Sequence, residues 1–175
     1  MRYRLGTRRD AAKLAALHTA VADHQTSLHG KGIWSYHTSE RGALHMLRTS
    51  RVIVATDGKS IVGTARLQTK KPWAIDVSYF TPCERPLYLV SMAVLPERQG
   101  EGIGRKCMKE AERVARAWPA DAIRLDAFDS SAGAGGFYER AGYTERGRTR
   151  YKGSALIYYE LLLTKKSAGR AAKKP

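Results

Sequence analysis

The stretch Gln99-Gly100-Glu101-Gly102-Ile103-Gly104 lies between an apolar segment and an amphipathic one, and it decides the fold. The apolar segment, residues 87–95, ends at Pro96, which has no N–H for a strand ladder and therefore closes a predicted strand. After the glycines, apolar residues recur with the 3.6-residue period of a helix. They are Ile103, Cys107, Ala111, Val114, Ala115 and Trp118. The order is therefore strand, glycine-rich turn, helix.

Such a turn is suited to binding phosphate. Glycines at 100, 102 and 104 let the backbone turn tightly and approach a ligand closely. The first N–H groups of the helix have no partner within it, and they lie at the positive end of the helix dipole. A phosphate or pyrophosphate satisfies both properties. The spacing is neither that of a nucleoside triphosphate loop nor the Gly-x-Gly-x-x-Gly of dinucleotide-binding folds.

The turn instead matches Gln/Arg-x-x-Gly-x-Gly/Ala, and in this respect the chain resembles the GNAT superfamily of N-acetyltransferases. The resemblance extends to Met92-Ala93-Val94-Leu95-Pro96 before the turn, and to a second strand at 123–128 after it. It also includes the closing motif Phe137-Tyr138-Glu139-Arg140-Ala141-Gly142-Tyr143. Upstream, Asp57-Gly58 between two apolar runs predicts a hairpin, which GNAT proteins have at this place. The match covers roughly residues 50–163.

The resemblance implies a mixed α/β, GNAT-like fold. We expect a mostly antiparallel central sheet of about six to seven strands with splayed central strands, flanked by about four helices. Residues 1–164 would form one acetyltransferase domain, and 165–175 a basic disordered tail. Thr7 and Asp10 resemble a capping box that opens a first helix. We expect irregular structure over 24–36, a second helix capped by Thr38 or Ser39, and a short helix at about 132–141.

Composition is that of a globular domain, with 43% apolar and 27% charged residues in a chain of 175. Neither a signal peptide nor an apolar run long enough to span a membrane is evident, and two cysteines do not make a disulfide framework. We therefore expect a cytoplasmic protein without membrane partners, as a monomer or homodimer. The net charge is +15, and five of these charges lie in 165–175. With no nucleic-acid-binding signature, we expect nucleic acid to bind only non-specifically.

The resemblance implies acetyl-CoA as co-substrate. Main-chain groups of Met92 and Val94 would bind the pantetheine arm, and an N–H near Val94 would face the thioester oxygen. Arg98 and Arg105 bracket the turn and are candidates for pairing with phosphate oxygens. Ser131 replaces the asparagine that GNAT proteins often carry seven residues before the tyrosine. The full predicted binding set is Met92, Ala93, Val94, Gln99, Gly100, Glu101, Gly102, Ile103, Gly104, Arg105, Ser131, Phe137 and Tyr138.

Attack of an amine on a thioester requires an oxyanion donor, an acid for the leaving sulfur and an acceptor for the amine proton. Tyr138 aligns with the tyrosine that often protonates the sulfur in this superfamily. An ordinary core tyrosine is the alternative. For the base, Glu84 is a candidate, although a surface glutamate is the more common interpretation of its position. The other candidates are the five histidines of the first 45 residues: His18, His24, His29, His37 and His45.

Trp34, Tyr36 and Trp73 lie in segments expected to border the acceptor, where aromatic side chains could hold its alkyl part. No cluster has metal-ligand spacing, so we expect no metal. The sequence thus predicts an N-acetyltransferase acting on a primary amine of a small molecule or a protein. The alternative is a GNAT-like module that binds acyl-CoA or nucleic acid without turnover.

Overall fold

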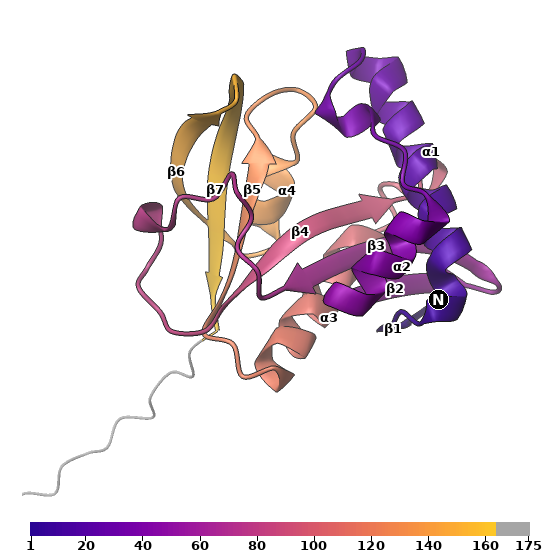
Figure 1. The fold of residues 1–175 in the computed structure, drawn as a ribbon, viewed down its shortest axis with the longest axis horizontal. Coiled ribbons are helices and arrows are strands. Elements are labelled where there is room, and N and C mark those ends of the chain that lie inside the picture. Colours follow the sequence, from indigo (N-terminus) through magenta and orange to yellow (C-terminus); the bar gives the residue numbers. More distant parts are fainter. Residues whose placement is uncertain (164–175) are drawn as a thin grey trace, which may run out of the picture.

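The computed structural model describes residues 1–163, and the predicted tail lies outside them. Seven strands form one sheet in the order β1-β2-β3-β4-β5-β7-β6, with β1 and β6 at its edges (Figure 1). All neighbours are antiparallel except β4 and β5. The strands are β1 (Arg2–Leu5), β2 (Arg51–Asp57), β3 (Ser60–Gln68), β4 (Pro86–Val94), β5 (Ala122–Phe128), β6 (Thr144–Tyr151) and β7 (Ser154–Leu162). The predicted mixed α/β fold is confirmed.

Helices cover both faces of the sheet. Helices α1 (Ala11–His29) and α2 (Glu40–Thr49) pack together on one face, while α3 (Ile103–Ala117) and α4 (Gly135–Arg140) lie on the other (Figure 1). Asp10 accepts a hydrogen bond from the N–H of Thr7, as the predicted capping box requires. A 3-10 turn, Arg8–Asp10, precedes α1. The side chain of Ser39 caps α2. Within the described residues, no helix combines the length and apolar character needed to cross a membrane.

The two central strands separate partway along their length. β4 pairs with β5 only from Pro86 to Tyr88, although both strands continue beyond that point. On its other side, β4 stays paired with β3 as far as Val94, with one irregularity at which Val90 has no partner. A bulge of this kind bends a strand and increases its twist. The sheet therefore opens between the carboxyl-terminal half of β4 and that of β5.

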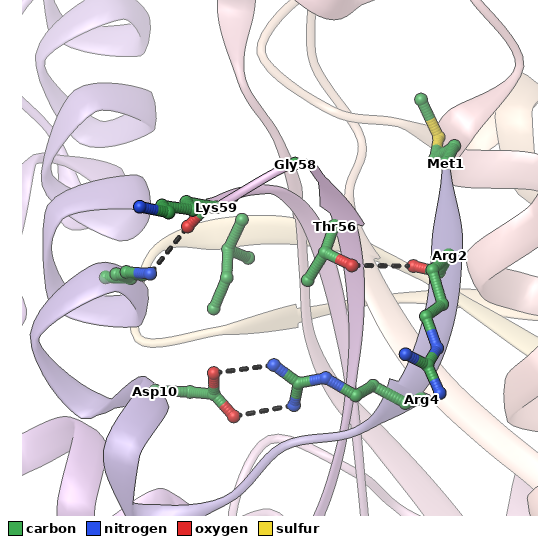
Figure 2. Close-up of a pocket in the computed structure, with 9 residues that line it drawn as sticks. Met1, Arg2, Arg4, Asp10, Thr56, Gly58 and Lys59 are labelled. Carbon is green, nitrogen blue, oxygen red and sulfur yellow. Dashed lines mark hydrogen bonds and ion pairs between the residues drawn. The ribbon is translucent and has the colours of Figure 1, made fainter.

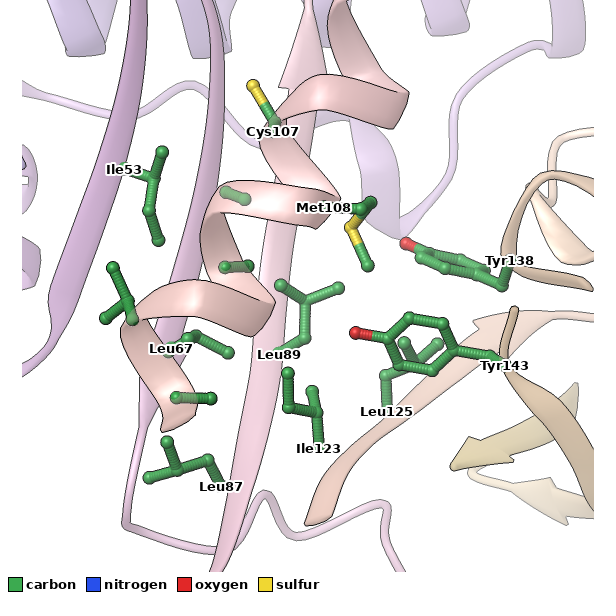
Figure 3. Packing of buried hydrophobic residues seen from close by; sticks show 14 of the residues in the cluster. Ile53, Leu67, Leu87, Leu89, Cys107, Met108, Ile123, Leu125, Tyr138 and Tyr143 are labelled. Carbon is green, nitrogen blue, oxygen red and sulfur yellow. The ribbon is translucent and has the colours of Figure 1, made fainter. Parts of the chain in front are cut away.

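Helix α3 closes the main core. Its predicted apolar stripe is buried from Ile103 to Ala115, including Cys107, whose exposed fraction is 0% (Figure 3). Trp118, just past the end of the helix, is half-buried. The helix approaches β3 closely because Gly63 has no side chain: a Cβ there would lie 2.7 Å from Cγ2 of Ile103. A second core lies under α1 and α2, with Leu14, Leu17 and Val54 among its buried members. Both cores include residues of β4, the strand that borders the opening of the sheet.

Two sequence expectations need correction. Residues 24–29 are not irregular, because α1 continues to His29 and ends at Gly30, whose φ is 75°. Helix α4 is shorter than predicted and begins only at Gly135. The glycine-rich segment before it is packed tightly, since a Cβ on Gly133 would lie 1.8 Å from the carbonyl oxygen of Phe128. The connection from β3 to β4, residues 69–85, packs Ile75 and Phe80 against the sheet and contains a 3-10 turn at Val77–Tyr79.

Candidate active site

The connection from β4 to α3 has the conformation that its glycines predict. Gly100 has a φ of 85° and Gly102 a φ of 77°, both in the left-handed region that favours glycine. Gly102 is the N-cap residue of α3, and no side chain caps the helix there. The N–H groups of the first turn are therefore left for a ligand, at the positive end of the helix dipole.

A cavity of about 640 Å³ lies at this helix terminus. Its wall is formed by the end of β4, the start of α3, the segment before α4, α4 itself and the last turns of α1. The predicted acetyl-CoA residues on this wall are Met92, Ala93, Val94, Gln99, Gly100, Gly102, Ile103, Gly104, Arg105, Ser131 and Phe137. Residues far apart in the sequence, from α1 to α4, thus meet around one space.

Two residues of the predicted binding set are not on the wall. The carboxylate of Glu101 forms an ion pair with Arg98, 2.7 Å between Nε and Oε1. The side chain of Tyr138 is directed into the core instead, and its neighbour Phe137 faces the cavity. Arg98 also pairs with Asp57, so its guanidinium is already engaged in two ion pairs.

Two other arginines supply positive charge to the wall. Arg105, predicted from sequence, and Arg140, which sequence reasoning missed, both line the cavity. Neither forms an ion pair with any residue of 1–163. Arginine's planar fork is well matched to phosphate oxygens. The wall therefore combines free backbone N–H groups with two available guanidinium groups.

Tyr138 is 8% exposed and lies against Tyr143 and Tyr159 in the main core (Figure 3). Burial raises the pKa of its phenol above the ordinary value of 10, and the negative charge of Asp126 raises it further. The phenol therefore keeps its proton at neutral pH. The hydroxyl end of the ring points toward Met108 of α3 (Figure 3).

Asp126 is a candidate that sequence reasoning missed. It lies on β5 beyond the point where β4 and β5 separate, and it is only partly exposed. Burial raises the pKa of its carboxyl above the ordinary value of 3.8. Its charge raises the pKa of both Tyr138 and Tyr158, and it lies opposite Tyr158 in the β5–β7 register. A signal was present in the sequence, since an aspartate interrupts the apolar run Leu125-Asp126-Ala127.

The structure does not bring Glu84 to the cavity. Glu84 is exposed and precedes β4, whereas the cavity lies at the other end of that strand. Nine strand residues at roughly 3.3 Å each separate the two ends. We therefore withdraw Glu84 as the proton acceptor, because a catalytic base must come within hydrogen-bond reach of the amine.

The predicted aromatic residues differ in their positions. Trp34 packs edge-on against His29 and Phe128, and so connects the end of α1 to the end of β5. Tyr36 and Trp73 are 79% and 84% exposed, and neither lies on the cavity wall. Only Trp34 is thus close to the opening of the sheet.

The histidines are also dispersed. His29 lines the cavity, where its Nδ1 lies 3.5 Å from Oγ of Ser131. His37 pairs with Asp23 on the surface, and His18 is a half-buried residue of α1, where desolvation lowers its pKa to about 4. Among residues 1–163, no group of three or more His, Cys, Asp or Glu side chains is arranged to hold a metal ion.

A second cavity, of about 340 Å³, lies beside β1 and the β2–β3 hairpin (Figure 2). Its polar groups already bind one another. Arg4 holds Asp10 through two hydrogen bonds of 2.7 and 2.8 Å, and Lys13 donates to the carbonyl of Lys59 (Figure 2). It borders the start of α1, but Asp10, the N-cap residue there, already pairs with Arg4, so the larger cavity is the candidate active site.

The sequence model of the acetyltransferase (GNAT) family matches residues 17–143, well over half of the chain. The chain therefore belongs to the acetyltransferase (GNAT) family. Among curated proteins compared by sequence, none matches it.

Solved structures share the fold over almost the whole chain. A ribosomal-protein-alanine N-acetyltransferase from Brucella melitensis has a TM-score of 0.71 at 19% identity, covering 93% of this chain and 100% of its own. A putative acetyltransferase from Salmonella typhimurium, solved with its cofactor acetyl-CoA, has a TM-score of 0.70 at 18% identity, covering 97% and 98%. An aminoglycoside 6'-acetyltransferase type Ii has a TM-score of 0.72 at 15% identity, covering 95% and 99%.

Proposed function

We propose that this protein is an acetyl-CoA-dependent N-acetyltransferase that transfers the acetyl group to a primary amine by direct attack. One observation carries the proposal. The uncapped N-terminus of α3 faces a cavity that extends along Met92–Val94, a part of β4 that is not paired with β5. The first feature suits a pyrophosphate, and the second leaves β4 main-chain groups free for a pantetheine arm. The residues present therefore fit acetyl-CoA.

The chain's own groups supply the catalytic functions. Helix N–H groups with Arg105 and Arg140 hold the phosphates, and β4 main-chain N–H groups bind the arm and the thioester oxygen. Tyr138 is the proposed acid, donating to the departing sulfur, because its raised pKa keeps the phenol protonated before the reaction. Reaching the sulfur requires its hydroxyl to approach the cavity beside Phe137. Asp126 replaces Glu84 as the proposed acceptor of the amine proton.

The names of the solved neighbours do not select one acceptor. One is named for a ribosomal protein's alanine and another for an aminoglycoside, so protein amines and small-molecule amines are both represented. We propose a primary amine as the shared chemistry of the acceptor. Nucleic acid is proposed only as a non-specific partner of the positive surface.

The proposal is tested by titrating the protein calorimetrically with acetyl-CoA at moderate salt, followed by an amine screen that monitors free thiol. We expect saturable one-site binding. Gly102→Asp should weaken it at least about tenfold, because the new carboxylate occupies the helix N-terminus and repels phosphate. Gly58→Asp is the matched control, since it adds the same charge at a positive φ in the hairpin, away from the cavity.

Failure to bind acetyl-CoA at millimolar concentration would reject the proposal and favour a basic binding module without turnover. Equal affinities of the two aspartate variants would instead show that the ligand does not bind at the α3 terminus.

A further inference from the structure

A group of polar side chains lies on the α1 face of the sheet, beside the candidate active site. It consists of His18 and Gln25 on α1, Arg66 on β3 and Ser91 on β4. Arg66 and Ser91 are partners in the β3–β4 register, at the irregularity where Val90 is unpaired. Gln25 lines the cavity, and so does Met92, the residue after Ser91. Gln25 is thus the member of the group on the cavity wall, and Ser91 is next to a wall residue in the sequence.

Arg66 has no ionic partner in this group. Its Nε is buried and makes no hydrogen bond, and no carboxylate of residues 1–163 lies within ion-pair distance of its guanidinium. Desolvation lowers the pKa of Arg66, yet an arginine remains charged. Arg124, a buried arginine, forms an ion pair with Glu160 at 3.0 Å, while Arg66 is half-buried. Charges removed from water are normally paired with an opposite charge. Arg124 has such an anionic partner, and Arg66 has none among residues 1–163.

Two other side chains of the group also lack partners. Oγ of Ser91 and Oε1 of Gln25 are both buried without a hydrogen bond. His18 supplies no negative charge in either protonation state, and burial with the charge of Arg66 keeps its imidazole neutral at neutral pH. Unpaired buried polar groups are rare in native structures, and each calls for a partner such as a ligand, an ion or water. The partner that the Arg66 guanidinium calls for is an anion.

The opposite charge is available across the opening of the sheet. Asp126 pairs in register with Tyr158, and Tyr158 packs with Tyr88 in a small cluster against which Val90 also lies. Asp126 thus belongs to the same face as Val90, near the opening. A molecule bound in this region meets a cation on β3 and a carboxylate on β5.

We propose that the acceptor amine carries a carboxylate, and that Arg66 binds this carboxylate while the amine faces the cavity. This inference rests on the proposed acetyl transfer and names the acceptor class: amino acids and related amino carboxylates. Arg66 supplies a two-pronged charged hydrogen bond, and Ser91 donates from its hydroxyl. Polycations such as polyamines are disfavoured, because they bring positive charge toward an unpaired arginine.

The test uses pairs of acceptors that differ only in the carboxylate: a panel of amino acids and the corresponding amino acid amides, with spermidine as a polycation. Acetyl transfer is followed by thiol release with wild-type protein and with Arg66→Gln. We expect amino acids to exceed their amides in kcat/KM by about 10- to 100-fold, the range of a charged hydrogen bond. Arg66→Gln should remove that preference through KM.

Four further measurements make the result specific. Acetyl-CoA affinity should be the same in Arg66→Gln and wild-type, since Arg66 is not on the wall at the α3 terminus. Arg66→Lys should restore part of the preference, because it keeps the charge without the fork. Arg9→Gln, which removes an exposed positive charge, should leave the preference unchanged. Binding of N-acetylglycine and its amide, measured calorimetrically, repeats the comparison without turnover.

The outcomes separate the two proposals. If acetyl-CoA does not bind, the proposed function fails, and this inference fails with it. If acetyl-CoA binds, either of two results overturns the inference alone. The first is that the amides or spermidine are acetylated with the same kcat/KM as the amino acids. The second is that wild-type and Arg66→Gln do not differ, either in activity toward the panel or in binding of N-acetylglycine.

Discussion

Tyr138 and Tyr143 are two buried phenols that differ in their relation to the cavity. Tyr138 follows Phe137 of the cavity wall, whereas Tyr143 lies beyond α4, and its hydroxyl is buried without a hydrogen bond. Burial raises the pKa of both phenols. If Tyr138 provides the acid, the two hydroxyl groups must differ in their effect on the reaction.

We expect Tyr138→Phe to lower kcat by about 10²- to 10⁴-fold, the usual contribution of a general acid, with acetyl-CoA affinity unchanged. Tyr143→Phe should leave kcat unchanged and be neutral or slightly stabilising, because it removes an unpaired buried hydroxyl. Steady-state kinetics and calorimetry on both variants measure this. A Tyr138→Phe enzyme as fast as the wild-type would remove Tyr138 from the mechanism.

The ionisation of Asp126 leads to a prediction about the pH dependence of activity. A carboxyl acts as a base only when it is ionised, and burial raises the pKa of Asp126. Activity should therefore decline as the pH falls through this raised pKa, at a higher pH than an exposed aspartate would give. Asp126→Asn should lower kcat/KM by about 10²-fold or more and abolish that acidic limb. A pH–rate profile of the variant that keeps the limb would assign it to another group.

Among the secondary-structure elements, the contact between α3 and β3 depends most directly on a single residue. A Cβ on Gly63 would lie 2.7 Å from Cγ2 of Ile103 and 3.5 Å from the sulfur of Cys107. The helix cannot move away without disturbing its own N-terminus, which borders the cavity. The closeness of this packing therefore links the stability of the fold to the shape of the site.

We expect Gly63→Ala to lower the free energy of unfolding by about 1–3 kcal/mol, the usual cost of overpacking a core. Gly42→Ala in α2 is the matched control. Its new Cβ has room, 3.4 Å from the nearest atom, and alanine is the better helix former, so it should stabilise by up to about 1 kcal/mol. Urea denaturation compares the two. If both variants changed the free energy of unfolding by the same amount, or if Gly63→Ala stabilised the protein, the packing argument would be contradicted.

For the molecule as a whole, the dominant physical property is the net charge of +15. Much of this charge is unrelated to the cavity, where only a few arginines lie. We expect mixed-sequence duplex DNA to bind at low salt without sequence preference, and to lose at least about tenfold in affinity between ~50 and ~200 mM salt. Removing 165–175, which carry five positive charges, should weaken this binding further.

We expect the affinity for acetyl-CoA to depend less on salt than the affinity for the duplex. Fixed helix N–H groups contribute to acetyl-CoA binding, and salt screens their interactions less than it screens those of surface charges. Fluorescence anisotropy for the duplex and calorimetry for acetyl-CoA give both salt dependences. Duplex binding that kept a sequence preference at ~200 mM salt would instead indicate a sequence-specific nucleic-acid function.

Local features of the chain could be predicted from the sequence without the structure. Pro96 ends β4, Gly100 and Gly102 take positive φ, and the apolar stripe of α3 is buried, because each depends on near neighbours in the chain. The same reasoning failed for the end of α1. Its last turns direct Gln25 and His29 to the cavity, so the apolar periodicity that predicts a helix fades while the helix continues.

The residues alone thus specified the order of elements, the glycine turn and the membership of a fold class, since hydrophobic period and turn chemistry are short-range properties. Tertiary structure decided the rest. It separated β4 from β5, moved Glu84 away from the cavity, buried Tyr138 and left Arg66 without an anion. These outcomes depend on which distant segments pack together, and burial and unpaired charge arise only from that packing.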